Sequence, residues 1–355
     1  MEQHLGHRVH YENLRAFIDR SDQIHPTWVP ITYTGVDNFI EGFPLFPRNI
    51  RGSLICRRQV RQGLKINTSD VLYFNTQVPA ALGSLPVKDK PYLIATDITP
   101  IQYDRLAAPY HHHVDSNHLL RWFKHRVNTK VFQGAAWVLP WSSWAAESLI
   151  QDYGVDSRRV QVLPVGIDVE RWRPAEHVNQ KPVRILFVGG DFERKGGTLL
   201  LEAFRSLPAG SAELILVTRA ALTHEKGVVV HNNIQPNSAE LLEIYQSSDI
   251  FALPSNAEAF GIAAVEASAS ALPVIATSSG GLPDIVVHQE TGFLIPVGDV
   301  RSLATHLRIL VENTELRRRM GQAAYRRAHS QFDARKNADR LVEILCETVS
   351  ERENR

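Results

Sequence analysis

The 355-residue chain contains only two cysteines, Cys56 and Cys346, and no uninterrupted apolar run of about 18 residues. The two cysteines lie far apart and have neither metal-ligand nor redox spacing, which fits a reducing cytosol and two ordinary buried thiols. The N-terminal sequence does not have the pattern of a signal peptide. We therefore expect a cytoplasmic protein, compatible with a peripheral position at the inner face of a membrane.

Neither sign of charge dominates, because 39 Lys and Arg residues are balanced by 38 Asp and Glu residues, with a formal net charge of +1. This balance removes any global electrostatic reason to bind nucleic acid, so we expect no nucleic-acid partner. Apolar residues make up 44% of the chain and charged residues 22%, as in a globular protein. The length exceeds what one hydrophobic core usually serves and predicts about two domains.

Short apolar segments alternate with amphipathic stretches along the whole chain, which is typical of parallel sheets covered by helices on both faces. In the first half, the predicted strands are Trp28–Tyr33, Val71–Asn75, Tyr92–Thr96, Ala136–Trp141 and Val160–Pro164. The predicted helices in this half are Arg51–Gly63, His118–Phe132 and Ser143–Tyr153.

A polar segment with two prolines, Arg171–Pro182, is the predicted domain linker. The strands predicted after it are Val183–Val188, Leu214–Val217, Val228–His231, Ile250–Leu253 and Pro273–Ala276. The helices predicted after it are Gly197–Leu207, Ser238–Ser247, Gly261–Ser270 and Val300–Glu312, most of which begin beside Gly, Ser or Asp.

The alternation predicts an α/β protein with two doubly wound, Rossmann-like parallel-sheet domains, residues 1–172 and 183–330. Residues 331–355 are expected to form a C-terminal helix, which can pack back on the first domain. Ligands of such domains bind at the carboxyl ends of the strands, here in the cleft that the two domains face.

The segment Glu258–Glu266 has two carboxylates separated by seven residues, at the head of a Gly/Ala-rich helix. Glu258 precedes this helix and Glu266 lies two turns inside it. Backbone N–H groups of Phe260, Gly261 and Ile262 stand at the positive end of the helix, where an anionic group binds well. The layout predicts a nucleotide-sugar site.

Two glycine-rich segments follow other strands of the same half. In Gly189–Gly197, glycines admit a phosphate close to the backbone, and Arg194 and Lys195 can neutralise a departing diphosphate. A glycine-rich turn with solvated charges remains an equal alternative for this segment alone. In Ser278–Asp284, a glycine pair again allows a phosphate or sugar near the main chain. The three motifs at three successive strand ends favour one ligand site.

The order of these motifs resembles the retaining glycosyltransferases of family 4 (glycosyl transferases group 1), which have the two-domain GT-B fold. The resemblance covers essentially the whole chain. In the first domain, Leu163–Asp168 is similar to the family's segment before the linker, and Trp141–Leu149 to its preceding strand-to-helix turn. Leu5-Gly6-His7 is similar to its first glycine-rich loop, with Gly6 as a binding residue.

The resemblance implies a role for each residue of the second domain. Glu266 would bind the ribose hydroxyls of a nucleoside diphosphate, and Glu258 a hydroxyl of the donor sugar, since carboxylates accept several hydrogen bonds. Lys195 would bind phosphate, and Ile234 would contact the base through its backbone. The binding positions also include Gly189 and Gly190 of the loop and the N–H groups of Phe260, Gly261 and Ile262. The family's reaction needs no bound metal and no cofactor besides the nucleotide-sugar donor.

The chain departs from the family pattern at three points. Gly190 stands where the family usually has Arg, and Arg194 is the candidate to supply that charge. Asp97 is the nearest polar residue where the family often has His, although a turn or cap aspartate is an equal interpretation. No apolar strand precedes Gly6, so either the true start lies upstream of Met1, which we favour, or the first domain lacks its first strand.

Two further segments have alternative interpretations. His111–His113 has the composition of a metal site, but consecutive histidines cannot all face one ion, and we expect a loop without metal. His118–Lys130 is a basic amphipathic stretch that either lies on an anionic membrane or, as we expect, packs its apolar stripe in the first domain.

The sequence as a whole predicts an enzyme that moves a sugar from a nucleoside-diphosphate donor to a hydroxyl of a sugar, glycan or lipid-linked acceptor, with retention at the anomeric carbon. The candidate catalytic residues are Lys195, Arg194, Glu258 and Asp97. The alternatives are a catalytically impaired nucleotide-sugar or glycan binder, and a GT-B epimerase or phosphorylase. Side chains do not specify the base and sugar of the donor, because the base is expected to contact the backbone.

Overall fold

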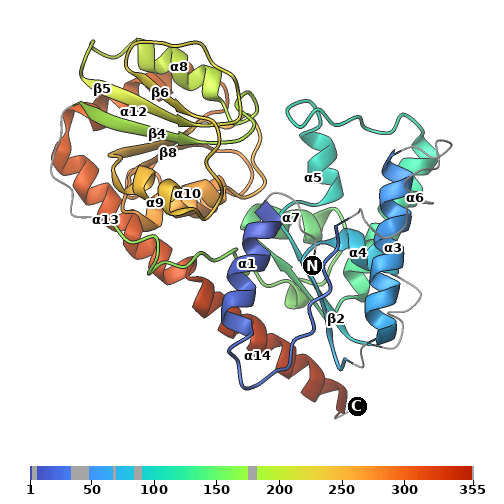
Figure 1. Ribbon diagram of the computed structural model, residues 1–355. Coiled ribbons are helices and arrows are strands. Elements are labelled where there is room, and N and C mark those ends of the chain that lie inside the picture. Colours follow the sequence, from blue (N-terminus) through green and yellow to red (C-terminus); the bar gives the residue numbers. More distant parts are fainter. Residues whose placement is uncertain (2–5, 33–47, 67–68, 84–89, 175–181, 354–355) are drawn as a thin grey trace. The chain divides into compact units, whose positions relative to one another are not determined.

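The computed structural model describes residues 1, 6–32, 48–66, 69–83, 90–174 and 182–353 (Figure 1). The chain divides into two compact units. The first unit comprises Met1–Arg105, His113–Val165 and Ala334–Arg355, and the second comprises Leu106–His112 and Gly166–Asp333. Of the predicted linker, residues 175–181 lie outside the described part of the chain.

The first unit contains a parallel sheet of three described strands in the order β1-β2-β3. The strands are β1 (Leu72–Phe74), β2 (Tyr92–Thr96) and β3 (Trp137–Pro140). Its described helices are α1 (Gly6–Ile18), α3 (Arg48–Ile66), α4 (Gln77–Gly83), α5 (Pro100–Arg105), α6 (His118–Gly134), α7 (Ser143–Gln151) and α14 (Ala334–Glu353), with a 3-10 turn at Ser157–Arg159. Helix α1 packs on α14, and α4 packs on α3 and α6. Side chains from the sheet and these helices form one core that includes Phe74, Ile94 and Phe132.

Two predicted strands of the first unit are not strands in the structure. Trp28–Thr32 is irregular apart from an isolated bridge at Ile31, and Tyr33 is not described. Pro30 has no N–H to donate, which weakens any ladder there. The segment after Val160 runs beside β3, where Gln161 N donates to Val138 O at 3.1 Å and Leu163 N to Pro140 O at 2.9 Å. These bonds form only an isolated bridge at Val160.

The apolar stripe of α6 is buried only toward the end of the helix. Val131 and Phe132 are buried in the core, whereas Leu119 is 76%, Trp122 54% and Phe123 58% exposed. Our expectation that this stripe packs within the domain is therefore wrong for the first half of the helix. Among the described residues of α6, only Val131 and Phe132 are buried, so the first turns of this helix leave their apolar side chains exposed.

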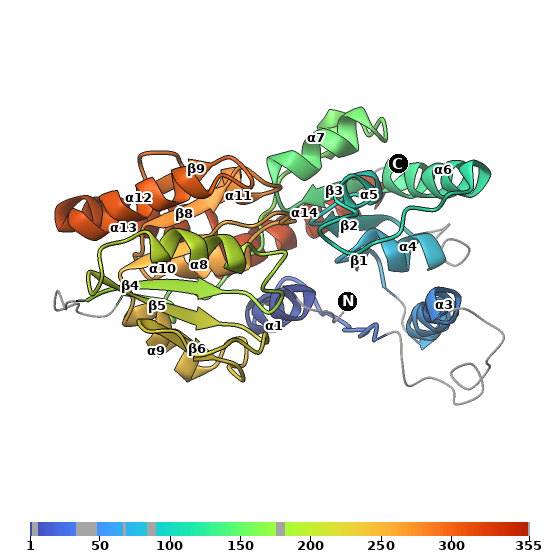
Figure 2. The same cartoon turned by 90° about the horizontal axis from the view of Figure 1, so that it is seen from above.

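The second unit is a doubly wound α/β domain with a six-stranded parallel sheet in the order β6-β5-β4-β7-β8-β9. Its strands are β4 (Val183–Val188), β5 (Ala212–Val217), β6 (Val228–His231), β7 (Ile250–Leu253), β8 (Val274–Thr277) and β9 (Gly292–Ile295). Its helices are α8 (Gly197–Arg205), α9 (Ala239–Gln246), α10 (Ile262–Ala269), α11 (Leu282–Ile285), α12 (Val300–Glu312) and α13 (Thr314–Gln331). Helix α8 packs with α12 and α10 with α13, so helices cover both faces of the sheet (Figures 1 and 2).

Helix starts in the second unit follow the predicted cap residues. Ser238 Oγ accepts from Leu241 N at 3.1 Å, and Asp299 Oδ1 accepts from Ser302 N at 2.9 Å. Strand β9 was not among the predicted strands. The basic side chains of α13 are not all solvated, since Arg317 is buried and donates to the carbonyls of Leu310 and Val311.

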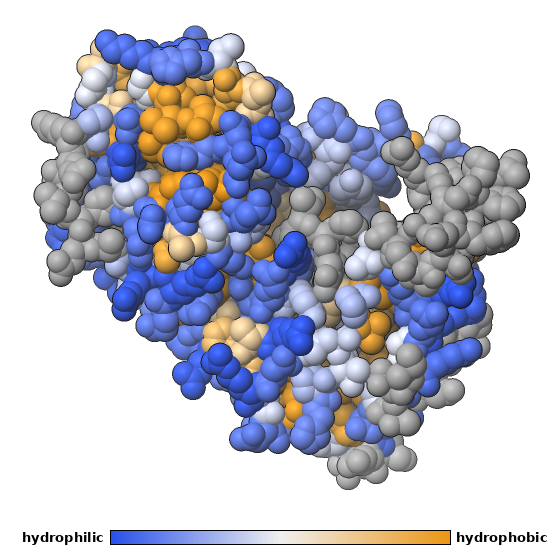
Figure 3. All heavy atoms as spheres, viewed as in Figure 1, coloured by the Kyte–Doolittle hydropathy of each residue, from blue (hydrophilic) through white to orange (hydrophobic). Residues whose placement is uncertain are grey.

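No helix in the described part of the chain is long and apolar enough to span a membrane. On the face seen in Figure 3, apolar residues form separate patches among polar ones. Cys56 is fully buried, as predicted, while Cys346 of α14 is only partly buried.

Candidate functional site

The three sequence motifs of the second unit lie at the carboxyl ends of three adjacent strands. The loop 189–196 follows β4, the loop 254–261 follows β7, and the turn 278–281 follows β8. Strand β7 pairs with β4 on one side and with β8 on the other. The chain leaves β4 toward β5 and returns to β7 on the opposite side, so the motifs surround the topological switch point of the sheet.

An ion pair joins the first two of these loops. Lys195 Nζ donates to Glu258 Oε2 at 2.7 Å, and both side chains are largely buried. Ser255 Oγ also donates to Glu258 Oε2, at 3.3 Å, and Ser279 Oγ accepts from Glu258 N at 3.3 Å. The carboxylate is therefore held in a fixed position beside one cation.

The glycine pair after β8 makes room for protein backbone rather than for a ligand. A Cβ at Gly280, whose φ is +54°, would lie 1.6 Å from the carbonyl oxygen of Glu258. Gly281 N donates to Ala259 O at 3.1 Å. Our interpretation that this pair admits a phosphate or sugar is thus replaced by a structural one, because the space beside Gly280 is taken by the backbone of Glu258.

Arg194 connects the two loops through hydrogen bonds. Its Nε donates to Asp191 Oδ2 at 3.0 Å and its Nη1 to Ala257 O at 2.8 Å, while only 12% of the side chain is exposed. The guanidinium also lies 4.7 Å from the ring centroid of Tyr110. These bonds give Arg194 a structural role in joining the two loops. Arg194 is therefore poorly suited to replace the arginine that the family usually has at the position of Gly190.

Arg219, which sequence reasoning missed, lies beside Gly190. A Cβ built on Gly190 would come within 2.9 Å of Arg219 Nε and 3.0 Å of its Nη2. Arg219 follows β5, the strand next to β4, and is exposed. No carboxylate among the described residues forms an ion pair with it. A side chain at position 190 would displace the guanidinium, so glycine there keeps the place open for Arg219.

Glu266 is buried in the interior of α10 and interacts with a tyrosine of α9. Tyr245 OH lies 2.9 Å from Glu266 Oε2 and 3.1 Å from Ala263 O. Burial raises the pKa of Glu266 to about 7, although the hydrogen bond from Tyr245 and the charge of Lys195 act in the opposite direction. The carboxyl group therefore changes its charge close to neutral pH.

The remaining predicted residues of this unit lie in loops that follow the carboxyl ends of its strands. Gly261 is the N-cap of α10, with a φ of +110° and no side-chain cap, so the first turn begins at Ile262. Phe260 is buried, and its ring packs edge-on to Phe332 at 6.1 Å. Ile234 is half-buried in the loop after β6.

In the first unit, the residue after Gly6 lies close to Asp97 although the two are far apart in sequence. Gly6 begins α1, and the next residue, His7, has its Nε2 3.7 Å from Asp97 Oδ1, just beyond β2. The His7 ring also packs on Trp141 at 5.0 Å, and its buried Nδ1 has no hydrogen-bond partner among the described residues. Sequence reasoning proposed Asp97 alone, whereas the structure adds His7.

A second histidine of α1 is fixed in its neutral form. His10 Nε2 lies 3.3 Å from Tyr73 OH, and burial, reinforced by His7, lowers the pKa of His10 to about 3.

No group of three or more potential metal ligands occurs in the described part of the chain, which includes His111–His113.

These two α/β domains with parallel sheets have the GT-B architecture, and two family models match the chain. The model described as "Glycosyltransferase Family 4" matches residues 4–171, and the model described as "Glycosyl transferases group 1" matches residues 168–327. The two models follow one another along nearly the whole chain. The protein belongs to the family 4 glycosyltransferases of the GT-B type.

Curated relatives match about half of the chain. A D-inositol 3-phosphate glycosyltransferase of Rhodococcus opacus is 30% identical over 224 residues, which are 56% of this chain and 50% of that protein. An MMP alpha-(1->4)-mannosyltransferase of Mycolicibacterium hassiacum is 29% identical over 220 residues, 59% of this chain and 53% of that protein. The chain thus spans about half the length of the curated relatives it matches.

Solved structures share the fold at low sequence identity. A glycosyltransferase from Rickettsia africae superposes with a TM-score of 0.72 at 16% identity, covering 98% of this chain and 97% of that one. HepE from Anabaena, in complex with UDP and glucose, has a TM-score of 0.71 at 18% identity, with 97% and 96% covered. These similarities confirm the predicted fold class.

Proposed function

We propose that the protein transfers a sugar from a nucleoside-diphosphate donor to a hydroxyl acceptor, with retention at the anomeric carbon. The observation that carries this proposal is the Lys195–Glu258 ion pair at the switch point of the second sheet, next to the buried carboxyl of Glu266. One cation and two carboxylates match the parts of a nucleotide sugar, namely a diphosphate, a sugar and a ribose. Family membership and the UDP complexes of HepE from Anabaena agree with this assignment.

Each charged group has a distinct role in this proposal. Glu266 accepts hydrogen bonds from the ribose hydroxyls, and Glu258 accepts one from the donor sugar. Lys195 and Arg219 neutralise the diphosphate, assisted by N–H groups at the start of α10. Ile234 borders the base and contacts it through the backbone. The first unit binds the acceptor, a sugar, glycan or lipid-linked hydroxyl, near His7 and Asp97.

The reaction exchanges one bond at the anomeric carbon for another. The bond from that carbon to the diphosphate oxygen breaks, the acceptor oxygen forms a new bond on the same face, and its proton passes to the departing diphosphate. The protein contributes positioning and stabilisation of the negative charge that develops on the diphosphate. Lys195 and Arg219 supply that stabilisation in place of a bound metal, and no further cofactor enters the proposal.

Two other functions use the same donor site. A nucleotide-sugar or glycan binder would hold the donor without turnover, and a GT-B epimerase or phosphorylase would act on it without an acceptor hydroxyl. The His7–Asp97 pair at the strand ends of the first unit favours the transferase, because it presents polar groups where an acceptor is expected.

Incubation with a panel of nucleoside-diphosphate sugars and hydroxyl acceptors tests the proposal. We expect acceptor-dependent release of the nucleoside diphosphate, a product of retained anomeric configuration by NMR, and full activity with EDTA. Thermal stabilisation by the true donor is expected even without acceptor, by about 2.7 kcal/mol at 100 times its dissociation constant. Stabilisation without any turnover would identify a binder, and turnover without acceptor or with phosphate would identify an epimerase or phosphorylase.

Arg219→Ala is expected to raise the KM for the donor about tenfold, because one charge-assisted hydrogen bond to the diphosphate is lost. The melting temperature should stay unchanged, since Arg219 is exposed. Arg205→Ala is the matched control, because Arg205 is an exposed arginine of the same unit that pairs with Glu225. Steady-state kinetics with varied donor measure the effect, and an unchanged donor KM in Arg219→Ala would exclude this residue from the site.

We also propose that the protein is cytoplasmic and that it contacts an anionic membrane surface through α6. Leu119, Trp122 and Phe123 share one exposed face of this helix, and Arg126 packs over the Trp122 ring at 5.4 Å. Exposed aromatic and apolar residues next to basic ones are typical of helices that lie in a membrane interface.

Sedimentation with phosphatidylglycerol vesicles tests the membrane contact. The double variant Leu119→Ser/Phe123→Ser should bind these vesicles at least about tenfold more weakly, because two large apolar side chains no longer enter the interface. Ile150→Ser, which changes an exposed apolar residue of α7, should bind as the parent does. Equal binding of the parent and both variants to these vesicles would contradict the proposal. Binding of the parent to neutral vesicles as strongly as to phosphatidylglycerol vesicles would also contradict it.

A further inference from the structure

Tyr245 of α9 connects the buried carboxyl of Glu266 to the first turn of α10. Its hydroxyl oxygen lies 2.9 Å from Glu266 Oε2 and 3.1 Å from Ala263 O. A phenol has one proton to donate, so it can serve only one of these two acceptors at a time. An ionised carboxylate is the stronger acceptor and takes that proton, whereas a protonated Glu266 leaves it to Ala263 O. The position of this hydroxyl therefore affects how readily Glu266 ionises.

Two buried aromatic rings pack on the ring of Tyr245. The Trp172 ring stands edge-on to it, with the ring centroids 5.1 Å apart and an interplanar angle of 89°. The Phe251 ring of β7 stacks on it, with the centroids 5.8 Å apart. All three side chains are fully buried. Edge-on and stacked pairs are the favoured aromatic geometries, so Trp172 and Phe251 fix the direction in which the Tyr245 hydroxyl points.

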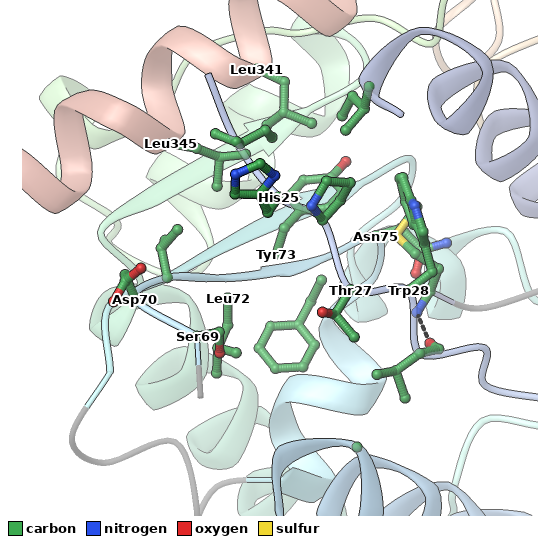
Figure 4. Close-up of a pocket in the computed structure, with 18 of the residues that line it drawn as sticks. His25, Thr27, Trp28, Ser69, Asp70, Leu72, Tyr73, Asn75, Leu341 and Leu345 are labelled. Atoms are coloured by element: carbon green, nitrogen blue, oxygen red, sulfur yellow. Dashed lines mark hydrogen bonds between the residues drawn. The ribbon is translucent and has the colours of Figure 1, made fainter. Parts of the chain in front are cut away.

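Tyr73 of the first unit has a different environment. It lines a cavity of about 620 Å³ beside β1, together with Leu72, Leu341 and Leu345 (Figure 4). A side chain next to a cavity has no contacting atoms on that side, and the missing contacts cannot hold it. Tyr245 is instead held by the rings that pack on it, which makes its position dependent on these neighbours.

Trp172 belongs to the segment by which the chain enters the second unit, which begins at Gly166. The C-terminal ends of α9 and α10 both bind this segment. Gln246 Nε2, in the last residue of α9, donates to Arg173 O at 2.9 Å. Ser270 Oγ, in the C-cap of α10, donates to Trp172 O at 3.5 Å. The segment is thus fixed to the two helices that carry the tyrosine and the glutamate.

We propose that Trp172 is a positioning residue of the donor site, which holds the Tyr245 hydroxyl where it can donate to Glu266 and so prepares this carboxylate for the ribose. The inference rests on the proposed function, in which Glu266 binds the ribose of a nucleoside-diphosphate sugar. Burial raises the pKa of Glu266 to about 7, while the hydrogen bond from Tyr245 and the charge of Lys195 lower it. Loss of the Trp172 ring weakens the contribution of Tyr245.

The titration of Glu266 in the donor-free full chain tests this role directly. NMR follows isotope-labelled glutamate carboxyl carbons against pH, and Glu266→Gln identifies the signal. Trp172→Leu is expected to move the midpoint upward by roughly one pH unit, as Tyr245→Phe does, because the carboxylate loses a charge-assisted hydrogen bond. Trp172→Phe keeps an aromatic ring and should titrate close to the parent. Phe293→Leu, which changes another buried aromatic residue of the unit, should leave the midpoint unchanged.

A double variant shows whether Trp172 acts through Tyr245. In Trp172→Leu/Tyr245→Phe the hydroxyl is absent, so the midpoint should equal that of Tyr245→Phe alone. An unchanged midpoint in Trp172→Leu, or a shift that adds to that of Tyr245→Phe, would overturn the inference. If Trp172→Leu does not fold, Gln246→Ala takes its place, because it removes only the bond to Arg173 O. Its midpoint should also rise, and no rise would overturn the inference.

Donor affinity separates a failure of this inference from a failure of the proposed function. Trp172→Leu should bind the donor about fivefold more weakly at about pH 7, because a midpoint one unit higher lowers the ionised fraction of Glu266 from about one half to about one tenth. At about pH 9 its affinity should approach that of the parent, whereas equal weakening at both pH values would overturn the positioning role. Parent-like donor affinity in Glu266→Gln would contradict the proposed function, and the donor-free titration would still test Trp172.

Discussion

Lys195→Ala is expected to lower kcat/KM for the donor about a hundredfold or more, which is the usual effect of removing one group that stabilises developing charge. Lys195 Nζ lies 2.7 Å from Glu258 Oε2, so this cation is already fixed at the strand ends where the diphosphate is proposed to bind. The substitution also leaves the Glu258 carboxylate buried without its partner, at a cost of about 3 kcal/mol in the free energy of unfolding. The fold should persist with a lower melting temperature.

A second variant separates the loss of catalysis from the loss of stability. Lys195→Met combined with Glu258→Gln removes both charges and keeps similar volumes, so the melting temperature should recover while donor turnover stays low. Lys226→Ala, which changes an exposed lysine of the same unit, is the control for a general charge effect. If Lys195→Ala retained the donor kinetics of the parent, the proposed donor site would be wrong.

The affinity for a nucleoside-diphosphate sugar is expected to increase roughly tenfold between pH 6 and pH 8. Glu266 titrates near pH 7, because burial outweighs the hydrogen bond from Tyr245 and the charge of Lys195. Only its ionised form accepts hydrogen bonds from both ribose hydroxyls, and the ionised fraction rises from about one tenth to about nine tenths over this range. Isothermal titration at several pH values measures the change.

Variants of Glu266 and of its partner Tyr245 test whether this pH dependence comes from Glu266. Glu266→Gln should bind the donor weakly at every pH and lose the dependence, and Glu266→Ala should weaken donor use at least as severely with the fold retained. Tyr245→Phe removes the hydrogen bond that lowers the pKa of Glu266, so its midpoint should move to higher pH. A steep pH dependence that persists in Glu266→Gln would assign the titration to another group.

The same shift affects stability in the opposite direction. The pKa of Glu266 is raised from 4.5 in a free glutamate to about 7 in the folded protein, so the folded state holds this proton more tightly. The resulting stabilisation is complete below about pH 4.5 and is lost as the pH rises through 7. Neutral pH thus favours binding at the expense of stability, a combination found at functional sites.

Local sequence patterns predicted the second unit closely. Three strands have the predicted bounds, namely Val183–Val188, Val228–His231 and Ile250–Leu253. Short apolar runs bounded by turn residues are typical of strands that are buried on both faces of a parallel sheet. The sequence also placed Lys195 and Glu258 in one predicted site, and the structure shows that these two side chains form an ion pair. Their motifs follow strands that become neighbours in a doubly wound sheet.

Roles that depend on residues from distant strands were not visible in the sequence. Arg219 follows β5, and only the pairing of β5 with β4 brings its guanidinium to Gly190. His7 lacks any motif that links it to Asp97. The glycine pair at Gly280 was interpreted through the usual preference of phosphates for glycine, but backbone packing against Glu258 explains it.

The sequence by itself determined the fold class, the family and the order of the motifs in the second unit, since periodicity and glycine placement are local properties of the sequence and can be read without knowledge of packing. Only the tertiary structure decided which charged side chains meet and why burial brings the pKa of Glu266 to about 7. Burial, ion pairing and strand neighbourhood all depend on segments far apart in the chain, and folding alone brings these segments into contact.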